Sequence, residues 1–115
     1  MPFTTSAKDL MLDALPATVY VSAHTALPDE TGTNEVTGGT YARDSVTMAA
    51  SSTANRDSTT QPSLDIPSGT TVTHLGYWTA ATGGTFLGFK PIAAETYSNP
   101  GTLTVTDLDF NLVDA

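Results

Sequence analysis

Cysteine is absent from this sequence, which excludes a disulfide framework, a thiolate metal site and a cysteine nucleophile. Basic residues are scarce, because four Lys and Arg stand against twelve Asp and Glu, for a formal net charge of -8. Nucleic-acid binding needs clustered Lys and Arg to neutralise phosphates, and the four here are scattered, so neither a nucleic-acid nor an anionic-lipid partner is expected. No apolar run approaches the ~20 residues that cross a bilayer, so no membrane partner is expected.

Hydroxyl side chains supply the polarity that charge does not. Charged residues make up only 14% of the chain, and Thr and Ser take their place. Because Thr is β-branched and fits a pleated, half-exposed surface, this composition predicts a β domain with hydroxyl groups on its outer faces. The length of 115 residues fits a single domain. We expect an N-terminal helix or arm over residues 1–16 and a β domain over residues 17–115.

The start of the chain has the features of one helix. Ser6 can cap it, Asp9 follows three residues later as in a capping box, and Pro16 ends the run. One helical stripe gathers the apolar residues Leu10, Met11, Ala14 and Leu15. The stripe predicts a helix that packs on one end of a sheet. The alternative is a free arm that docks on a neighbouring subunit.

After Pro16 the apolar period changes from that of a helix to that of a strand. Residues 17–24 alternate, with Val19, Val21 and Ala23 on one face. A long polar loop follows over residues 25–40, with room for a short strand around Glu35 and Val36. Further along, we expect a strand over residues 41–49, a loop or exposed edge over 51–62, and an extended segment over 63–66.

The clearest local signal is a hairpin. Residues 70–80 and 85–91 are rich in β-formers and flank a turn with two consecutive glycines at 83 and 84. Strict alternation puts Val72, His74, Gly76 and Trp78 on one face and Leu75 and Tyr77 on the other. Strands over 101–105 and 107–112 complete the pattern. These elements predict a mainly β fold, a small antiparallel β-sandwich or partly open barrel with one N-terminal α-helix.

The residue types that usually carry chemistry do not form a motif. His24 and His74 have no metal-ligand spacing, and no GxSxG elbow supplies a nucleophile, so we expect two structural histidines, one facing solvent and one hydrogen-bonded. Asp107 and Asp109 share a strand face, and residues 29–35 superficially suggest a calcium loop. Both features are explained by solvated surface. The sequence therefore predicts no enzyme, no catalytic residue, no cofactor and no metal.

Aromatic residues gather in the predicted hairpin, and they allow two interpretations. The first is a core built around the single tryptophan. The second is a subunit interface or a carbohydrate site, because aromatic side chains dominate interface energetics. The residues concerned are Tyr77, Trp78, Phe86 and Phe89.

An ordered set of segments resembles a known family. The set comprises residues 4–15 (TTSAKDLMLDAL), 24–26 (HTA), 29–43 (DETGTNEVTGGTYAR), 66–78 (IPSGTTVTHLGYW) and 80–88 (AATGGTFLG). Together these segments resemble small virion proteins of tailed bacteriophages, whose members are labelled head decoration, minor capsid or tail-fibre proteins. The resemblance implies a structural virion protein with no catalytic residues.

The resemblance favours an accessory decoration protein on the capsid exterior, bound to the major capsid protein and to copies of itself as a homo-trimer. The alternatives are a tail-fibre or baseplate subunit, and a calcium- or carbohydrate-binding β module. Contacts with partners are expected through residues 2–15 and the loops 25–40 and 51–62. The individual candidates for partner contact are Thr4, Thr5, Lys8, Asp29, Glu30, Asn34, Arg43, Arg56 and Trp78.

Overall fold

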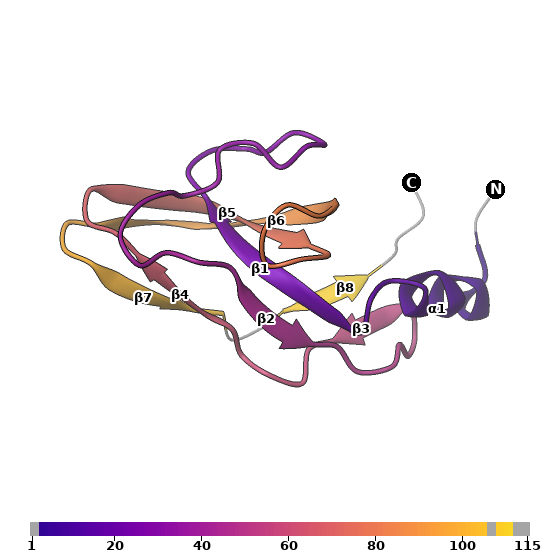
Figure 1. Ribbon diagram of the computed structural model, residues 1–115. Helices are drawn as coiled ribbons and strands as arrows, with labels where there is room; N and C mark the ends of the chain where they lie inside the picture. The colour runs from indigo at the N-terminus through magenta and orange to yellow at the C-terminus, as the bar shows by residue number, and fades with distance from the viewer. Residues whose placement is uncertain (1–2, 106–107, 112–115) are drawn as a thin grey trace.

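The computed structural model describes residues 3–105 and 108–111. One helix and eight strands lie within this part of the chain (Figure 1). In chain order they are α1 (Thr5–Asp13), β1 (Thr18–His24), β2 (Asp44–Thr47), β3 (Asn55–Asp57), β4 (Ser63–Ile66), β5 (Thr70–Trp78), β6 (Phe86–Tyr97), β7 (Gly101–Thr104) and β8 (Asp109–Asn111).

The strands form two layers. One layer is a four-stranded antiparallel sheet in the order β2-β1-β5-β6. The other layer contains the antiparallel pairs β3-β8 and β4-β7. Backbone hydrogen bonds from Ser58 to Leu108 and from Val105 to Pro62 extend both pairs toward one another. The sheets do not close into a barrel, so the fold is the mainly β antiparallel sandwich with one N-terminal helix.

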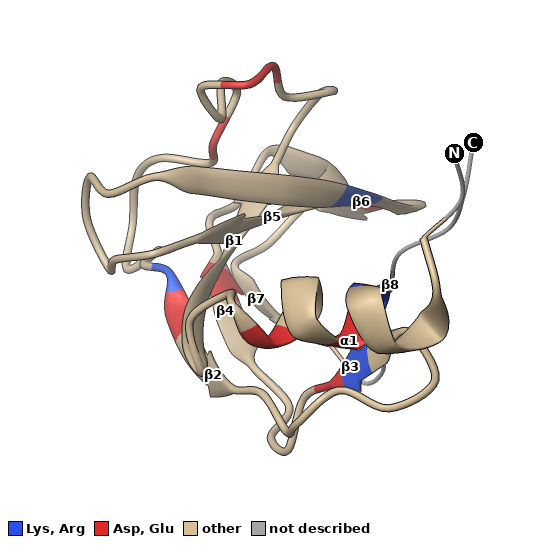
Figure 2. Cartoon of the chain, turned by 90° about the vertical axis from the view of Figure 1, so that its right-hand side faces the viewer, with Lys and Arg blue, Asp and Glu red and all other residues tan. Residues whose placement is uncertain are grey.

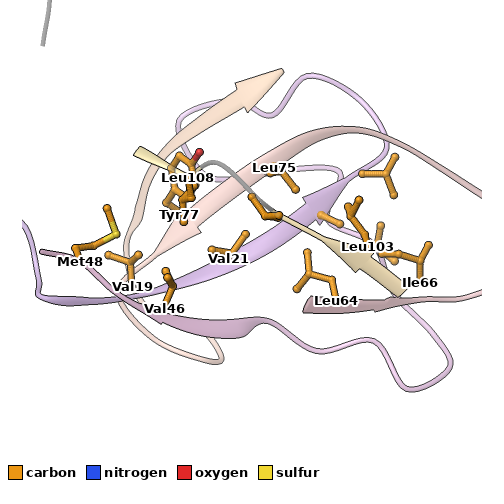
Figure 3. Close-up of a cluster of buried hydrophobic side chains, with 14 residues drawn as sticks. Val19, Val21, Val46, Met48, Leu64, Ile66, Leu75, Tyr77, Leu103 and Leu108 are labelled. Carbon is orange, nitrogen blue, oxygen red and sulfur yellow. The ribbon is translucent and has the colours of Figure 1, made fainter. Parts of the chain in front are cut away.

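The hydrophobic core fills the space between the two layers (Figure 3). Val19 and Val21 on β1 are fully buried, as alternation predicts. They face Leu64 on β4 and Leu103 on β7, from the opposite layer. One face of the four-stranded sheet is thus buried in the core, so a functional site could lie only on its other face or at its edges.

The helix differs from its prediction in cap and in buried face. Thr4, not Ser6, is the N-cap, and its hydroxyl accepts a hydrogen bond from the Ala7 amide at 3.1 Å. Leu12 is the buried residue of the helix, whereas Leu10 is 75% exposed and Met11 is 39% exposed. The predicted stripe is wrong because α1 packs against the short strand β3, so only a narrow line of the helix meets the domain.

Two strand predictions also need correction. Val72 belongs to the core together with Leu75, not to the face of His74, because a register shift between Val72 and His74 reverses the alternation. The segment 51–62, expected to be a loop or exposed edge, contains β3, whose Arg56 is buried opposite Phe110. The hairpin itself is confirmed, with a second strand that continues to Tyr97. Of the strand predicted over 107–112, residues 107 and 112 lie outside the described residues.

Candidate functional site

A buried polar network lies on the face of the four-stranded sheet that points away from the core. The His24 ring is bonded at both nitrogens: Nδ1 is 2.7 Å from the Thr33 carbonyl oxygen and Nε2 is 2.7 Å from the Ser22 hydroxyl. A carbonyl only accepts, so Nδ1 carries the proton and Nε2 accepts from Ser22. The Trp78 indole donates to the same hydroxyl at 2.8 Å. The Ser22 oxygen therefore both donates and accepts.

The Ser22–His24 pair has the spacing of a nucleophile and its base, but not the access. Both residues are completely buried. The Ser22 oxygen is also occupied by the Trp78 indole, and the third partner of the pair is a backbone carbonyl. Burial lowers the pKa of His24, which favours its neutral form. The arrangement joins β1, β5 and the loop that follows β1, and its chemistry is structural.

Two glycines make this network possible. Gly76 lies opposite Ser22 in the sheet, and a Cβ there would stand 2.5 Å from both the Ser22 hydroxyl and the His24 ring. Gly32 in the loop lies against Trp78, where a Cβ would stand 2.5 Å from the indole ring. Gly32 also has a φ of 76°, a conformation that glycine adopts without strain. The loop after β1 is therefore seated directly on the sheet.

Arg43 closes the rim of this covered region. Its guanidinium carbon lies 3.6 Å from the Trp78 ring centroid, a cation–π geometry. Its Nε and Nη2 each donate to a Glu35 carboxylate oxygen at 2.9 Å. Nη1 donates to the carbonyls of Ala80 and Gly83 in the β5–β6 turn. One side chain thus joins the 25–43 segment to the hairpin turn.

Glu35 is held as a carboxylate by its neighbours. Burial raises its pKa, but hydrogen bonds from Arg43 and from the Tyr41 hydroxyl outweigh burial, and the net pKa is lowered. The Tyr41 oxygen also accepts from the Ala23 amide on β1. Burial raises the pKa of Tyr41, so the phenol keeps its proton. These bonds connect the rim back to the centre of the sheet.

Arg56 performs the same task at the other end of the molecule. It is 5% exposed, and its guanidinium donates to the carbonyls of Leu12 and Leu15 at 2.9 Å and of Ala49 at 2.7 Å. Leu12 and Leu15 lie at the C-terminal end of α1 and just after it, and Ala49 follows β2. Arg56 therefore fixes α1 to the second layer.

The structure separates the predicted contact residues into two groups. Arg43, Arg56 and Trp78 belong to the internal framework just described, and Trp78 lies outside the main hydrophobic core that we expected it to organise. The others are surface or half-buried residues of α1 and the 25–34 loop, and they do not come together in one place. They are Thr4, Thr5, Lys8, Asp29, Glu30 and Asn34. Partner contact by any of the nine residues stays a prediction.

Local hydrogen bonds shape the exposed loop. The Asp29 carboxylate accepts from the amide and hydroxyl of Thr31, which lowers its pKa. Asn34, at a φ of 65°, donates from its amide to the Leu27 carbonyl. The calcium interpretation of this loop gains no support, because in residues 3–105 and 108–111 no group of His, Asp or Glu is arranged to hold a metal ion. In the same residues no helix is long and apolar enough to cross a bilayer.

An apolar strip lies along the first half of β6, in addition to the exposed apolar side chains Phe3, Leu10 and Met11 in and beside α1. Phe89 on β6 is 45% exposed and Leu27 in the neighbouring loop is 61% exposed. Phe89 lies between two hollows and lines both, together with Leu87 and Gly88. The hollow toward α1, about 380 Å³, includes Leu12 among its lining residues. The hollow toward the loop, about 560 Å³, includes Leu27.

The sequence analysis did not predict the His24 network or the internal hydrogen bonds of Arg43 and Arg56. The expectation of one solvent-facing histidine is met only in part, because His24 is buried and His74 is half-buried with its ring nitrogen 2.8 Å from the Thr73 hydroxyl. One signal for the arginines was the composition, because the chain has only four Lys and Arg against twelve Asp and Glu. Buried carboxylates and the carbonyls at helix ends both need donors, so each arginine could have been expected to form internal bonds. A second signal was Gly76, because a glycine inside a strand often marks a place where another group packs closely against the backbone.

Comparison with known proteins identifies a family for this chain. A search of curated proteins found no match to this chain. The family described as podophage GP4 fiber I protein gp80 matches residues 11–110, which include every described strand except the last residue of β8. The match covers far more than half of the chain. This chain therefore belongs to the podophage GP4 fiber I protein gp80 family, and it is a structural virion protein of tailed bacteriophages.

Proposed function

We propose that this chain is a structural subunit of the tail fibres of a bacteriophage. The observation that carries the proposal is the family match over residues 11–110, whose description names a fibre protein. It favours the tail-fibre alternative over the capsid decoration that the resemblance first suggested. The partners are other virion proteins and copies of this chain, and the role involves no catalysis.

The described structure fits a structural subunit whose side chains mainly stabilise its own fold. Arg43 and Arg56 both form internal hydrogen bonds, which fix a loop and a helix, respectively, to the sheets. The pair with catalytic spacing, Ser22 and His24, is sealed from solvent. A fold whose buried polar residues bond to one another suits a subunit that is repeated in an assembly. In such an assembly, many weak contacts between subunits add up through avidity.

Fractionation of purified particles tests the proposal. Particles are disrupted, heads and tails are separated, and each fraction is analysed by mass spectrometry with the major capsid protein as the marker for heads. We expect this chain in the tail fraction, and antibody against it should label fibres in electron micrographs. Recovery with heads alone would restore capsid decoration, and absence from intact particles would exclude a virion role.

A further inference from the structure

We infer that His24 is a pH-sensitive latch: a second proton on its ring releases the loop over residues 25–34 and uncovers Trp78 and Phe86. The loop lies on the outer face of the four-stranded sheet, away from the core (Figure 1). Figure 2 shows it above the sheet, with its acidic residues in red. The inference goes beyond the proposed function, because it concerns the response of one chain to acid and is independent of where in the virion the chain lies.

The loop over residues 25–34 is hydrogen-bonded mainly to itself. The Asp29 amide donates to the Thr33 hydroxyl at 3.2 Å, and the Asp29 carbonyl accepts from the Gly32 amide at 3.0 Å. The other hydrogen bonds of the loop also join its own residues. In the part of the chain that the structure describes, the exception is the bond from the His24 ring to the Thr33 carbonyl, at 2.7 Å. The loop can therefore move as one unit about its base.

Few residues of this loop pack against the sheet. Pro28 and Gly32 are buried, and the others are exposed. A Cβ added at Gly32 would stand 2.5 Å from the Trp78 indole and 2.9 Å from the Phe86 ring, so the loop backbone lies directly on both rings. Lifting the loop uncovers these two rings and leaves the hydrophobic core between the two layers in place. A segment with so few buried contacts opens at a lower cost than the whole fold.

The neutral His24 ring has a partner at each nitrogen beneath the loop. Nδ1 donates to the Thr33 carbonyl, and Nε2 accepts from the Ser22 hydroxyl. A proton from solvent turns Nε2 into a donor, so the Ser22 hydrogen loses its acceptor while the Trp78 indole still donates to the same oxygen. A buried charge and an unpaired buried hydroxyl hydrogen are both costly. Water can satisfy both when the loop lifts, so protonation favours the open loop.

The groups around the His24 ring do not offset the cost of its charge. Burial lowers the pKa of the ring, and Arg43 and, when protonated, His74 opposite it on β5 act in the same direction. The loop carbonyl and Glu35 favour the charged form, but Glu35 is already paired with Arg43 at 2.9 Å. From β6 the ring meets Phe86, which carries no charge. Acid should therefore open the loop before it unfolds the core.

Trp78 is the single tryptophan of the chain and is 7% exposed under the loop, so its fluorescence reports the opening. The full chain is titrated downward from about pH 7 until it unfolds, with acrylamide as the quencher. Circular dichroism follows the fold, and NMR of the His24 ring follows its protonation. The quenching constant should rise at least about twofold as the ring takes up its proton, while circular dichroism stays unchanged. A constant that stays flat during this protonation, or a ring that remains neutral until the chain unfolds, would overturn the inference.

Variants separate the latch from a general effect of acid. His24→Gln removes the titrating ring, so its quenching constant should not change with pH. Gly32→Ala forces the loop away from Trp78, so at neutral pH it should be quenched like the acidified wild type. Gly38→Ala is the matched control, because Gly38 also has a positive φ, of 104°, but nothing lies within 4 Å of its Cβ, and it should be quenched like the wild type. An acid-induced rise in His24→Gln, or a Gly32→Ala variant as protected as the wild type, would refute the latch.

Discussion

Two aromatic residues of β6, Phe86 near the turn and Phe89 further along the strand, differ in what covers them. Near the turn, Trp78 and Phe86 lie with ring centroids 5.0 Å apart under the loop that follows β1. Every polar group in the Ser22–His24–Trp78 network there has a partner. Three residues after Phe86 along the same strand, Phe89 is 45% exposed. One chain has thus sealed one aromatic site with its own loop and left the next one open.

This difference predicts that the two sites contribute unequally to the stability of the chain. The sealed site depends on Arg43, on two glycines and on a neutral histidine, so it is sensitive to single changes. The open strip depends on exposed apolar side chains that contribute little to a lone chain. Substitutions at the first site should therefore reduce stability more than substitutions at the second.

Arg43→Met should have the largest effect on stability. It leaves the Glu35 carboxylate without its cation, and the two side chains are only 9% and 21% exposed. We expect the free energy of unfolding to fall by about 3 kcal/mol. Urea unfolding measures this, and a double-mutant cycle with Glu35→Gln isolates the ion pair. A coupling energy near zero would mean that Arg43 acts through Trp78 and the turn carbonyls alone.

Gly76→Ala should rank next. The new Cβ would stand 2.5 Å from the His24 ring and 2.8 Å from the Phe86 ring, so the packed network must move. Overpacking of this kind costs about 1–3 kcal/mol. Gly88→Ala is the matched control on the partner strand, because nothing lies within 4 Å of its Cβ. Equal unfolding midpoints for the two variants would contradict the contrast between the sealed and open sites.

Acid should weaken the sealed site first. Burial lowers the pKa of His24 below its ordinary 6.5, so the unfolded chain binds a proton at higher pH than the folded chain does. The free energy of unfolding should therefore fall as the pH drops below about 6.5. The lowered pKa of Glu35 adds a further loss below its ordinary 4.5.

Urea unfolding at several pH values measures this dependence. His24→Gln should flatten the slope below pH 6.5, because the titrating ring is gone. Retention of the full slope in His24→Gln would assign the acid sensitivity to other groups. The comparison uses the slope and not the absolute stability, since replacing a buried, doubly bonded ring lowers stability at every pH.

Local pattern was enough to predict the framework of this fold. Alternation at Val19 and Val21 and the glycine turn at 83 and 84 gave the first strand, the hairpin and the sandwich class. What failed depends on contacts between distant residues. Val72 changes face because of a register shift, and Arg56 becomes buried only when β3 pairs with β8 near the other end of the chain.

The functional surface was predictable only in outline. The aromatic hairpin suggested both a core and an interface, and the structure places Trp78 and Phe86 under a loop while Phe89 stays open. The distinction comes from Gly32, far away in sequence, whose loop covers one ring and not the other.

The smallest effect on stability should come from Phe89→Ala. Its ring is 45% exposed, so removing it should lower the free energy of unfolding by less than about 1 kcal/mol. Phe86→Ala is the matched change under the loop, where the ring contacts Trp78 and His24, and it should cost about 2–3 kcal/mol. Urea unfolding at a concentration where the chain is monomeric compares them without any contribution from association. Equal costs would mean that Phe89 stabilises the chain as much as the covered Phe86 does, which would contradict the contrast between the sealed and open sites.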